Sequence, residues 1–281
     1  MSALTRFLTF IRFSHTVFAL PFALGAMVVA AHGWPGWKLF GLILLCMVFA
    51  RTAAMTFNRI TDWEIDKRNP RTEWRHRLLS RRSACVACMV SSVFFVGTSA
   101  LINRPCLLLS PVALGILFFY SLTKRFTHAA QFFLGLSLSV SPVGAWLAVT
   151  GTIAIPPLIL AAGVLCWVAG FDIIYATQDR EIDQREGLHS VVVWLGLPLA
   201  LVLAGWLHFM MFIALLAFGI SAHLGVTYFL GLMIVPILLV YEHRVARTLD
   251  STKINRAFFE TNAAIGLLFL TMVSTDTLLM Y

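Results

Sequence analysis

The sequence predicts an all-α membrane protein that crosses the bilayer nine times. Of its 281 residues, 59% are hydrophobic and only 12% are charged, which is more apolar surface than one soluble core can bury. The apolar residues also form long runs, and about 17–25 residues are needed for a helix to cross a bilayer core. We therefore expect a single membrane domain over residues 1–281.

Nine apolar runs along the chain are the predicted membrane spans. The first run is short and the seventh is long, so the ends of these two are the least sharply defined. In chain order, the runs cover residues 17–31, 39–57, 84–102, 107–122, 129–150, 157–175, 191–218, 224–241 and 259–279.

Positive charge is distributed unevenly between the predicted loops. Nearly all of the 21 Lys and Arg residues lie at the N-terminus or in alternate loops, and Arg104 is the clearest exception. Basic loops of membrane proteins remain on the cytoplasmic side. The pattern therefore predicts a multi-pass membrane protein with a cytoplasmic N-terminus. It also accounts for the net charge of +8 without a nucleic-acid partner.

Two clusters of polar residues with one shared spacing interrupt this apolar background. The first cluster is Asn58, Asp62 and Asp66, and the second is Tyr175, Asp179 and Asp183. Residues four apart lie on one face of a helix. A carboxylate within a membrane span costs about 2.5–3.5 kcal/mol even on the lenient insertion scale, so such acids need cations or a water-filled cavity.

The two clusters together predict a divalent-metal site made of two half-sites that face one cavity. Carboxylates around a cavity are what magnesium and a polyphosphate require. The alternative is that each cluster is a solvated helix end whose acids pair with nearby Arg or Lys. Two matched clusters on the same side of the membrane favour the metal site.

The residues that carry these clusters also resemble a known family. Residues 58–72, NRITDWEIDKRNPRT, resemble the NRxxDxxxDxxNPRT signature of the UbiA superfamily of intramembrane aromatic prenyltransferases. Residues 172–183, DIIYATQDREID, are similar to the DxxYAxQDxxxD motif of that family. Further similarity lies in residues 13–21, 120–125 and 141–146. The resemblance implies nine transmembrane helices around a central cavity, with the active site on the cytoplasmic side.

This family transfers an isoprenoid from a polyprenyl diphosphate to an acceptor, most often an aromatic ring, and depends on Mg²⁺. The resemblance assigns one magnesium ion to Asn58, Asp62 and Asp66, and a second ion to Asp179 and Asp183. It assigns the diphosphate oxygens to Arg59, Arg71, Arg75, Lys124, Tyr120 and Tyr175. These cations and hydrogen-bond donors suit the charge that develops on a leaving diphosphate.

Three other positions remain open at this stage. Asp172 either orients the acceptor or accepts a proton, or else it forms an ion pair with a neighbouring helix. His15 and His189 lie at membrane boundaries, where a hydrogen-bonded structural histidine is the commoner outcome.

The loop after Arg75 departs from the family pattern. It reads HRLLSRR over residues 76–82, where many relatives have a Pro-x-Gly turn, so its geometry is expected to differ.

Within the family, the chain most resembles the 4-hydroxybenzoate polyprenyltransferase-like enzymes, including the menaquinone prenyltransferases of the futalosine pathway. The expected acceptor is a hydroxylated aromatic carboxylate, either 4-hydroxybenzoate or 1,4-dihydroxy-6-naphthoate, in ubiquinone or menaquinone biosynthesis. Other UbiA-type acceptors remain an alternative.

Proteins of other classes fit the sequence less well. A cation-coupled transporter does not need basic loops beside both clusters. A phosphatidyl-alcohol synthase would show a different acidic motif, and a non-catalytic quinone-binding subunit would tolerate the loss of one cluster.

Overall fold

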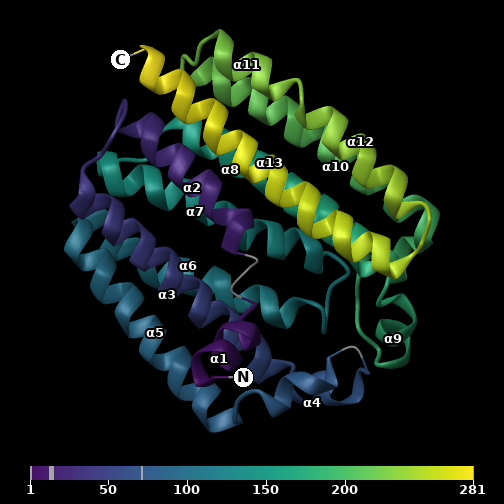
Figure 1. The fold of residues 1–281 in the computed structure, drawn as a ribbon. Coiled ribbons are helices and arrows are strands. Elements are labelled where there is room, and N and C mark those ends of the chain that lie inside the picture. The colour runs from purple at the N-terminus through teal and green to yellow at the C-terminus, as the bar shows by residue number, and fades with distance from the viewer. Residues whose placement is uncertain (1, 13–15, 71, 281) are drawn as a thin grey trace.

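A computed structural model describes residues 2–12, 16–70 and 72–280, and every regular element in that part of the chain is helical (Figure 1). The predicted all-α class is therefore confirmed. The elements are α1 (Ala3–Phe10), α2 (Thr16–Ala30), α3 (Trp37–Thr61), α4 (Trp63–Arg68), the 3-10 helix η2 (Glu73–Arg77), α5 (Arg81–Ile102), α6 (Arg104–Thr123), α7 (Ala130–Thr150), α8 (Ile155–Ala176), α9 (Arg180–Arg185), α10 (Val191–Ser221), α11 (Val226–Leu232), α12 (Val235–Ala246) and α13 (Ser251–Met280).

The long helices correspond to the predicted membrane spans. Among the described residues, eight helices are long and apolar enough to cross a membrane: α3, α5, α6, α7, α8, α10, α11 joined to α12, and α13. The remaining predicted span is α2, an apolar helix of 15 residues. All nine predicted runs thus lie on helices, although α2 is shorter than a typical spanning helix.

Two predicted spans are interrupted in ways that hydropathy does not reveal. Helix α10 bends at Gly196, whose φ of 74° and ψ of 167° are not helical, and Pro198 follows in the next segment. The eighth span is divided between α11 and α12 just before Pro236. Glycine adopts a positive φ without strain and proline lacks the amide hydrogen of a helix interior, so both breaks occur where the backbone tolerates them.

The ends of the helices separate into two sides of the bundle. Figure 1 shows α1, α4 and α9 at one end, whereas the last turns of α13 lie at the opposite end near α11. Both acidic segments are therefore on the side of the N-terminal helix, as the charge pattern predicts. Which side faces the cytoplasm stays a prediction.

Helix α8 lies at the centre of the bundle, packed against α7 and α10, and is the most buried of the spanning helices. Trp167 of α8 packs against Phe22 of α2, with ring centroids 4.9 Å apart. Its indole Nε1 donates a hydrogen bond of 2.7 Å to Asn262 of α13, and Asn262 Nδ2 donates one of 2.7 Å to Glu242 of α12. This polar chain joins three helices and holds α8 in place beside the site.

Asp276 organises the opposite end of the bundle. Its carboxylate accepts hydrogen bonds from the backbone N–H groups of Gly225 at 2.6 Å and Tyr228 at 3.2 Å, at the start of α11. The first N–H groups of a helix have no partner within the helix, and here a side chain of α13 supplies one. Because Asp276 is only 2% exposed, water cannot replace it.

We expect Asp276→Ala to destabilise the protein by about 1–3 kcal/mol, because two buried N–H groups lose their acceptor. The measurement is the melting temperature in detergent. Glu260→Ala is the control, since this exposed acid forms its one ion pair with a described residue one helical turn away, Arg256. Equal melting temperatures for the two variants would contradict the capping role.

Candidate active site

Both acidic segments sit at a break between two helices, and the two breaks share one backbone conformation. Asp62 lies between α3 and α4 with φ −91° and ψ 10°, and Asp179 precedes α9 with φ −101° and ψ 0°. In each segment the backbone N–H of the second acid donates to the backbone carbonyl of the first. The distance is 2.7 Å from Asp66 to Asp62 and 2.8 Å from Asp183 to Asp179. The matched spacing seen in the sequence is therefore matched in local structure.

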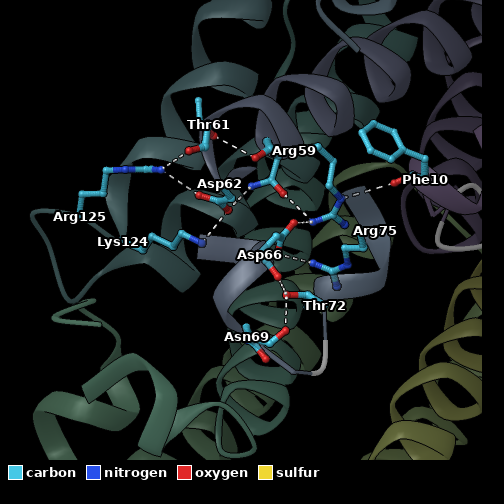
Figure 2. A network of polar contacts seen from close by, with 11 residues as sticks. Phe10, Arg59, Thr61, Asp62, Asp66, Asn69, Thr72, Arg75, Lys124 and Arg125 are labelled. Carbon is cyan, nitrogen blue, oxygen red and sulfur yellow. Dashed lines mark hydrogen bonds and ion pairs between the residues drawn. The ribbon is translucent and has the colours of Figure 1, made fainter. Parts of the chain in front are cut away.

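The carboxylate of Asp62 is held between two cations from the end of α6 (Figure 2). Lys124 Nζ lies 2.6 Å from Asp62 Oδ2, and Arg125 NH2 lies 3.0 Å from Oδ1. Asn58 Nδ2 donates a third hydrogen bond, of 3.3 Å, to Oδ2. Asp62 is 3% exposed. The pairing therefore compensates for the desolvation of this charge.

Asp66 is paired in the same way with cations of its own segment. Arg75 NH1 lies 2.9 Å from Asp66 Oδ1, and Arg59 NH1 lies 3.5 Å from Oδ2 (Figure 2). Arg59 also donates to Asn58 Oδ1 at 3.3 Å and to the carbonyl of Phe10 at 3.4 Å. Burial lowers the pKa of Arg75 to about 9, and the positive charges of Arg59 and Arg12 add to this effect. Arg75 still keeps its charge at neutral pH.

The second acidic segment lies close to the first. The pKa of Asp183 is raised to about 6, chiefly by burial and also by the negative charges of Asp179 and Asp62, while the positive charge of Lys124 opposes the shift. Asp183 is thus within electrostatic range of Asp62 and Lys124, as two half-sites facing one cavity require. Burial and the neighbouring acids therefore outweigh the effect of Lys124 on the pKa of Asp183.

The loops after the two acidic segments also contact each other. Arg68 NH2 lies 2.8 Å from Glu186 Oε2, which joins the α4 loop to the α9 loop. The backbone N–H of His189 donates to the carbonyl of Lys124 at 2.8 Å, and the His189 ring packs against His128 with centroids 4.7 Å apart. His189 is therefore part of the structure that supports Lys124.

An apolar cavity of about 460 Å³ lies among α2, α3, α5, α6, α7 and α8. Its lining includes Arg51 and Tyr120, and Tyr120 interacts electrostatically with Arg59 and Asp62. The cavity therefore extends from the charged cluster into the apolar interior of the bundle. Its mostly apolar lining suits a hydrocarbon chain whose polar end remains at the cluster.

The other predicted residues fall into three groups. The Tyr175 ring packs on Phe258 with centroids 4.7 Å apart, and Tyr175 interacts electrostatically with Arg75. Asp172 makes no ion pair with any described residue, so its alternative role as an ion-pair partner finds no support in this part of the chain. Arg71 and His15 lie outside the described residues.

The loop that lacks the Pro-x-Gly turn is ordered by other means. Residues 73–77 form η2, and Ser80 caps α5 by accepting the N–H of Ser83 at 3.1 Å. Leu78 and Leu79 pack against a cluster that contains Phe10 and Ile11 of the N-terminal segment. The changed sequence therefore fixes the loop to α1, and Arg75 remains directed at Asp66.

Sequence reasoning missed some residues of this site. Arg125 belongs to the predicted basic loop, but nothing in the sequence separates it from Lys124 as a partner of Asp62. Arg51 lies within an apolar span, where a charged residue indicates a functional site. Its NH2 donates to the carbonyl of Arg12 at 3.1 Å.

The donor set fits magnesium, because carboxylate and amide oxygens are the ligands that this ion prefers. Within the described part of the chain, however, no three His, Cys, Asp or Glu side chains lie close enough together to hold a metal ion. The acids of the first cluster are paired with Arg and Lys, as expected for the alternative of a solvated helix end. Asp62 is nevertheless buried and not solvated. A bound cation would offset the burial and the neighbouring negative charges that raise the pKa of Asp183.

Comparisons with known proteins identify the family of this chain. The UbiA prenyltransferase family matches residues 19–271. A 4-hydroxybenzoate octaprenyltransferase of Vibrio atlanticus (strain LGP32) is 30% identical over 244 residues, which are 85% of each chain.

Solved structures share the fold. The apo structure of a UbiA homologue from Aeropyrum pernix K1 has a TM-score of 0.84 and 27% identity, and covers 93% of this chain and 98% of that one. A UbiA homologue from Archaeoglobus fulgidus, solved with GPP and Mg²⁺, has a TM-score of 0.71 and 20% identity over 96% and 99% of the two chains. The chain therefore belongs to the UbiA prenyltransferase family, whose members are multi-pass membrane enzymes.

Proposed function

We propose that this prenyltransferase moves a polyprenyl group from a polyprenyl diphosphate to a hydroxylated aromatic carboxylate, either 4-hydroxybenzoate or 1,4-dihydroxy-6-naphthoate, in a Mg²⁺-dependent reaction. The observation that carries the proposal is the junction of a charged cluster with an apolar cavity. Four cations and the acids of both segments gather where the cavity lined by Arg51 and Tyr120 meets the cluster. A diphosphate with a long apolar tail matches both parts.

The acids and the cations have different roles in this proposal. Asn58, Asp62 and Asp66 would hold one Mg²⁺, and Asp179 and Asp183 a second. Once bound, the metal would offset the negative charge that grows on the diphosphate as the allylic C–O bond breaks. The A. fulgidus homologue was solved with GPP and Mg²⁺, which are the two kinds of ligand that this proposal brings together.

Lys124 has unused hydrogen-bonding capacity at the charged cluster. Its ammonium group has three donors, and in the described chain one contact, with Asp62, is present. The side chain is also 30% exposed. Arg125, in contrast, already donates to the carbonyls of Ser121 and Thr61 as well as to Asp62. We assign Lys124 to the diphosphate and Arg125 to the support of Asp62.

Arg59, Arg71 and Arg75 complete the proposed diphosphate contacts, with Tyr120 and Tyr175 as hydrogen-bond donors. Arg59 and Arg75 now pair with Asp66, so a diphosphate would compete with that carboxylate for their N–H groups. The apolar cavity keeps water from the allylic cation while a ring carbon of the acceptor attacks it.

Asp172 is our candidate for orienting the acceptor or accepting the ring proton. We further propose that the chain lies in the bacterial cytoplasmic membrane with this site on the cytoplasmic side, where the basic loops gather.

The direct test supplies the purified protein with one polyprenyl diphosphate, Mg²⁺ and each acceptor in turn. We expect diphosphate release together with a prenylated aromatic carboxylate, and no release after the metal is chelated. The product is identified by mass spectrometry. Diphosphate release with neither acceptor consumed would contradict the proposed acceptor class.

The metal assignment predicts that Asp62→Asn and Asp179→Asn each abolish turnover while the protein remains folded. The Asn side chain keeps the shape of Asp but removes the charge that a metal requires. Glu64→Gln and Glu181→Gln are the matched controls, because these neighbouring acids are 67% and 86% exposed and, among the described residues, form ion pairs only within their own helices. Near-normal turnover of either Asp variant at limiting Mg²⁺ would refute the two-cluster site.

Lys124→Ala is expected to lower kcat/KM for the donor by about 2–4 kcal/mol in transition-state free energy, the scale of one preorganised electrostatic contact. The KM of the acceptor should change little. Arg125→Ala serves as the comparison, because it removes the other cation of Asp62. If both variants lost the same donor kcat/KM, Lys124 would act only by neutralising Asp62, and its assignment to the diphosphate would be wrong.

A further inference from the structure

A second concave surface lies away from the charged cluster, between α10 and α12 on the outside of the bundle. This groove has a volume of about 740 Å³ and shares no lining residue with the apolar cavity. Its lining residues are Pro198, Leu201, Val202, Gly205, Trp206, Phe209, His243 and Arg247. Figure 1 shows α10 and α12 at the edge of the bundle, on the far side of α13 from α2.

The floor of the groove is an apolar strip along one face of α10. Pro198, Val202 and Trp206 follow one another at intervals of four residues, and the strip ends near Phe209. At the helical rise per residue, this strip is about 16 Å long, comparable with much of an acyl chain. Trp206 is 61% exposed, so the strip faces the surroundings of the protein and not its core.

Gly205 provides the depth of the groove. A methyl group added at this position would lie 3.9 Å from His243 Cε1, an ordinary contact, with no other atom nearer. The absence of a side chain here therefore leaves open space that a larger residue would fill without displacing the core. His243 closes the other wall, where its Nε2 lies 2.9 Å from Nδ1 of the buried His208.

One end of the groove carries positive charge without acidic partners. Arg247 directly follows α12, which ends at Ala246, and it is exposed at the boundary of that spanning segment. Neither its guanidinium nor that of Arg244 forms a hydrogen bond or ion pair with a described residue. Glu242 of the same helix points inward to Asn262, and Asp250 pairs with Lys253.

We propose that this groove binds one anionic phospholipid, with the phosphate at Arg247 and an acyl chain along the apolar strip of α10. The shared chemistry of the site is a phosphate group joined to a long hydrocarbon chain. A guanidinium at the membrane boundary binds phosphate oxygens, and an unpaired basic residue there favours anionic over zwitterionic headgroups. The apolar strip below it explains why the ligand is a lipid and not a free anion.

The test is native mass spectrometry of the full chain, purified in mild detergent, with added phosphatidylglycerol or phosphatidylcholine of the same acyl chains. We expect one phosphatidylglycerol to remain bound, with an affinity about fivefold above that of phosphatidylcholine, the effect of one basic residue near an anionic lipid. Arg247→Gln should remove this preference. Gly205→Leu should weaken the binding of both lipids, because it fills the groove.

Two matched controls separate the site from general effects. Arg104→Gln removes an exposed arginine that does not line the groove, and Gly97→Leu adds the same bulk at an exposed helical glycine with open space around it. Both controls should bind lipid as the wild type does. Equal retention of the two lipids by the wild type, or equal losses in Arg247→Gln and Arg104→Gln, would overturn the proposal.

Two competitors identify the occupant. Inorganic phosphate should not displace phosphatidylglycerol, because it has no chain to fill the apolar strip. Geranyl diphosphate should not displace it either, since the proposed donor site lies at the separate charged cluster. Displacement by phosphate would reassign the groove to a free anion, and displacement by geranyl diphosphate would reassign it to the donor; either result rejects a phospholipid site.

Discussion

The ion pairs of Asp62 with Lys124 and Arg125 are the constraint on which the rest of the site depends. Asp62 lies at the break between α3 and α4, whereas both cations come from the end of α6. Removing one partner from a buried ion pair typically costs about 3–5 kcal/mol, because the remaining charge stays desolvated. This carboxylate is almost fully buried, so α3 and α6 must end at the same place. The charged cluster and the cavity lined by those helices are thereby fixed together.

The two acidic segments share a backbone conformation but differ in the surroundings of their second acid. Asp66 is matched by Arg59 and Arg75, whereas the pKa of Asp183 is raised to about 6 by burial and by the neighbouring acids. Asp66 is thus paired with two cations, whereas Asp183 is desolvated and lies near other acids. Such an asymmetry suits a ligand that brings cations and phosphate together, because the metal meets acids and the phosphate meets Arg and Lys.

Polar groups elsewhere in the bundle follow the same rule that buried charge and hydrogen-bonding capacity need partners. Along α12, Glu242 turns inward to Asn262, while the next residue, His243, turns to the outer groove. Helix α12 therefore contributes both to the hydrogen-bonded side chains that hold α8 and to the lining of the outer groove. The interior polar chain positions α8, which carries Asp172 and Tyr175, whereas the outer groove is free to bind a separate ligand.

The sequence by itself determined the all-α class, the nine apolar runs, the two acidic segments and their shared side of the bundle, because hydropathy, charge and spacing are local properties of the chain. The family motif further named most of the residues that meet at the cluster. The tertiary structure alone decided that Arg125 pairs with Asp62, that Arg68 meets Glu186, and that Asp276 caps α11. These contacts join residues distant in sequence, and no local pattern specifies which of several cations or acids will meet. The sequence did not predict the bend at Gly196 for a related reason. An apolar run indicates that a segment lies in the membrane, but it does not specify the backbone angles within that segment.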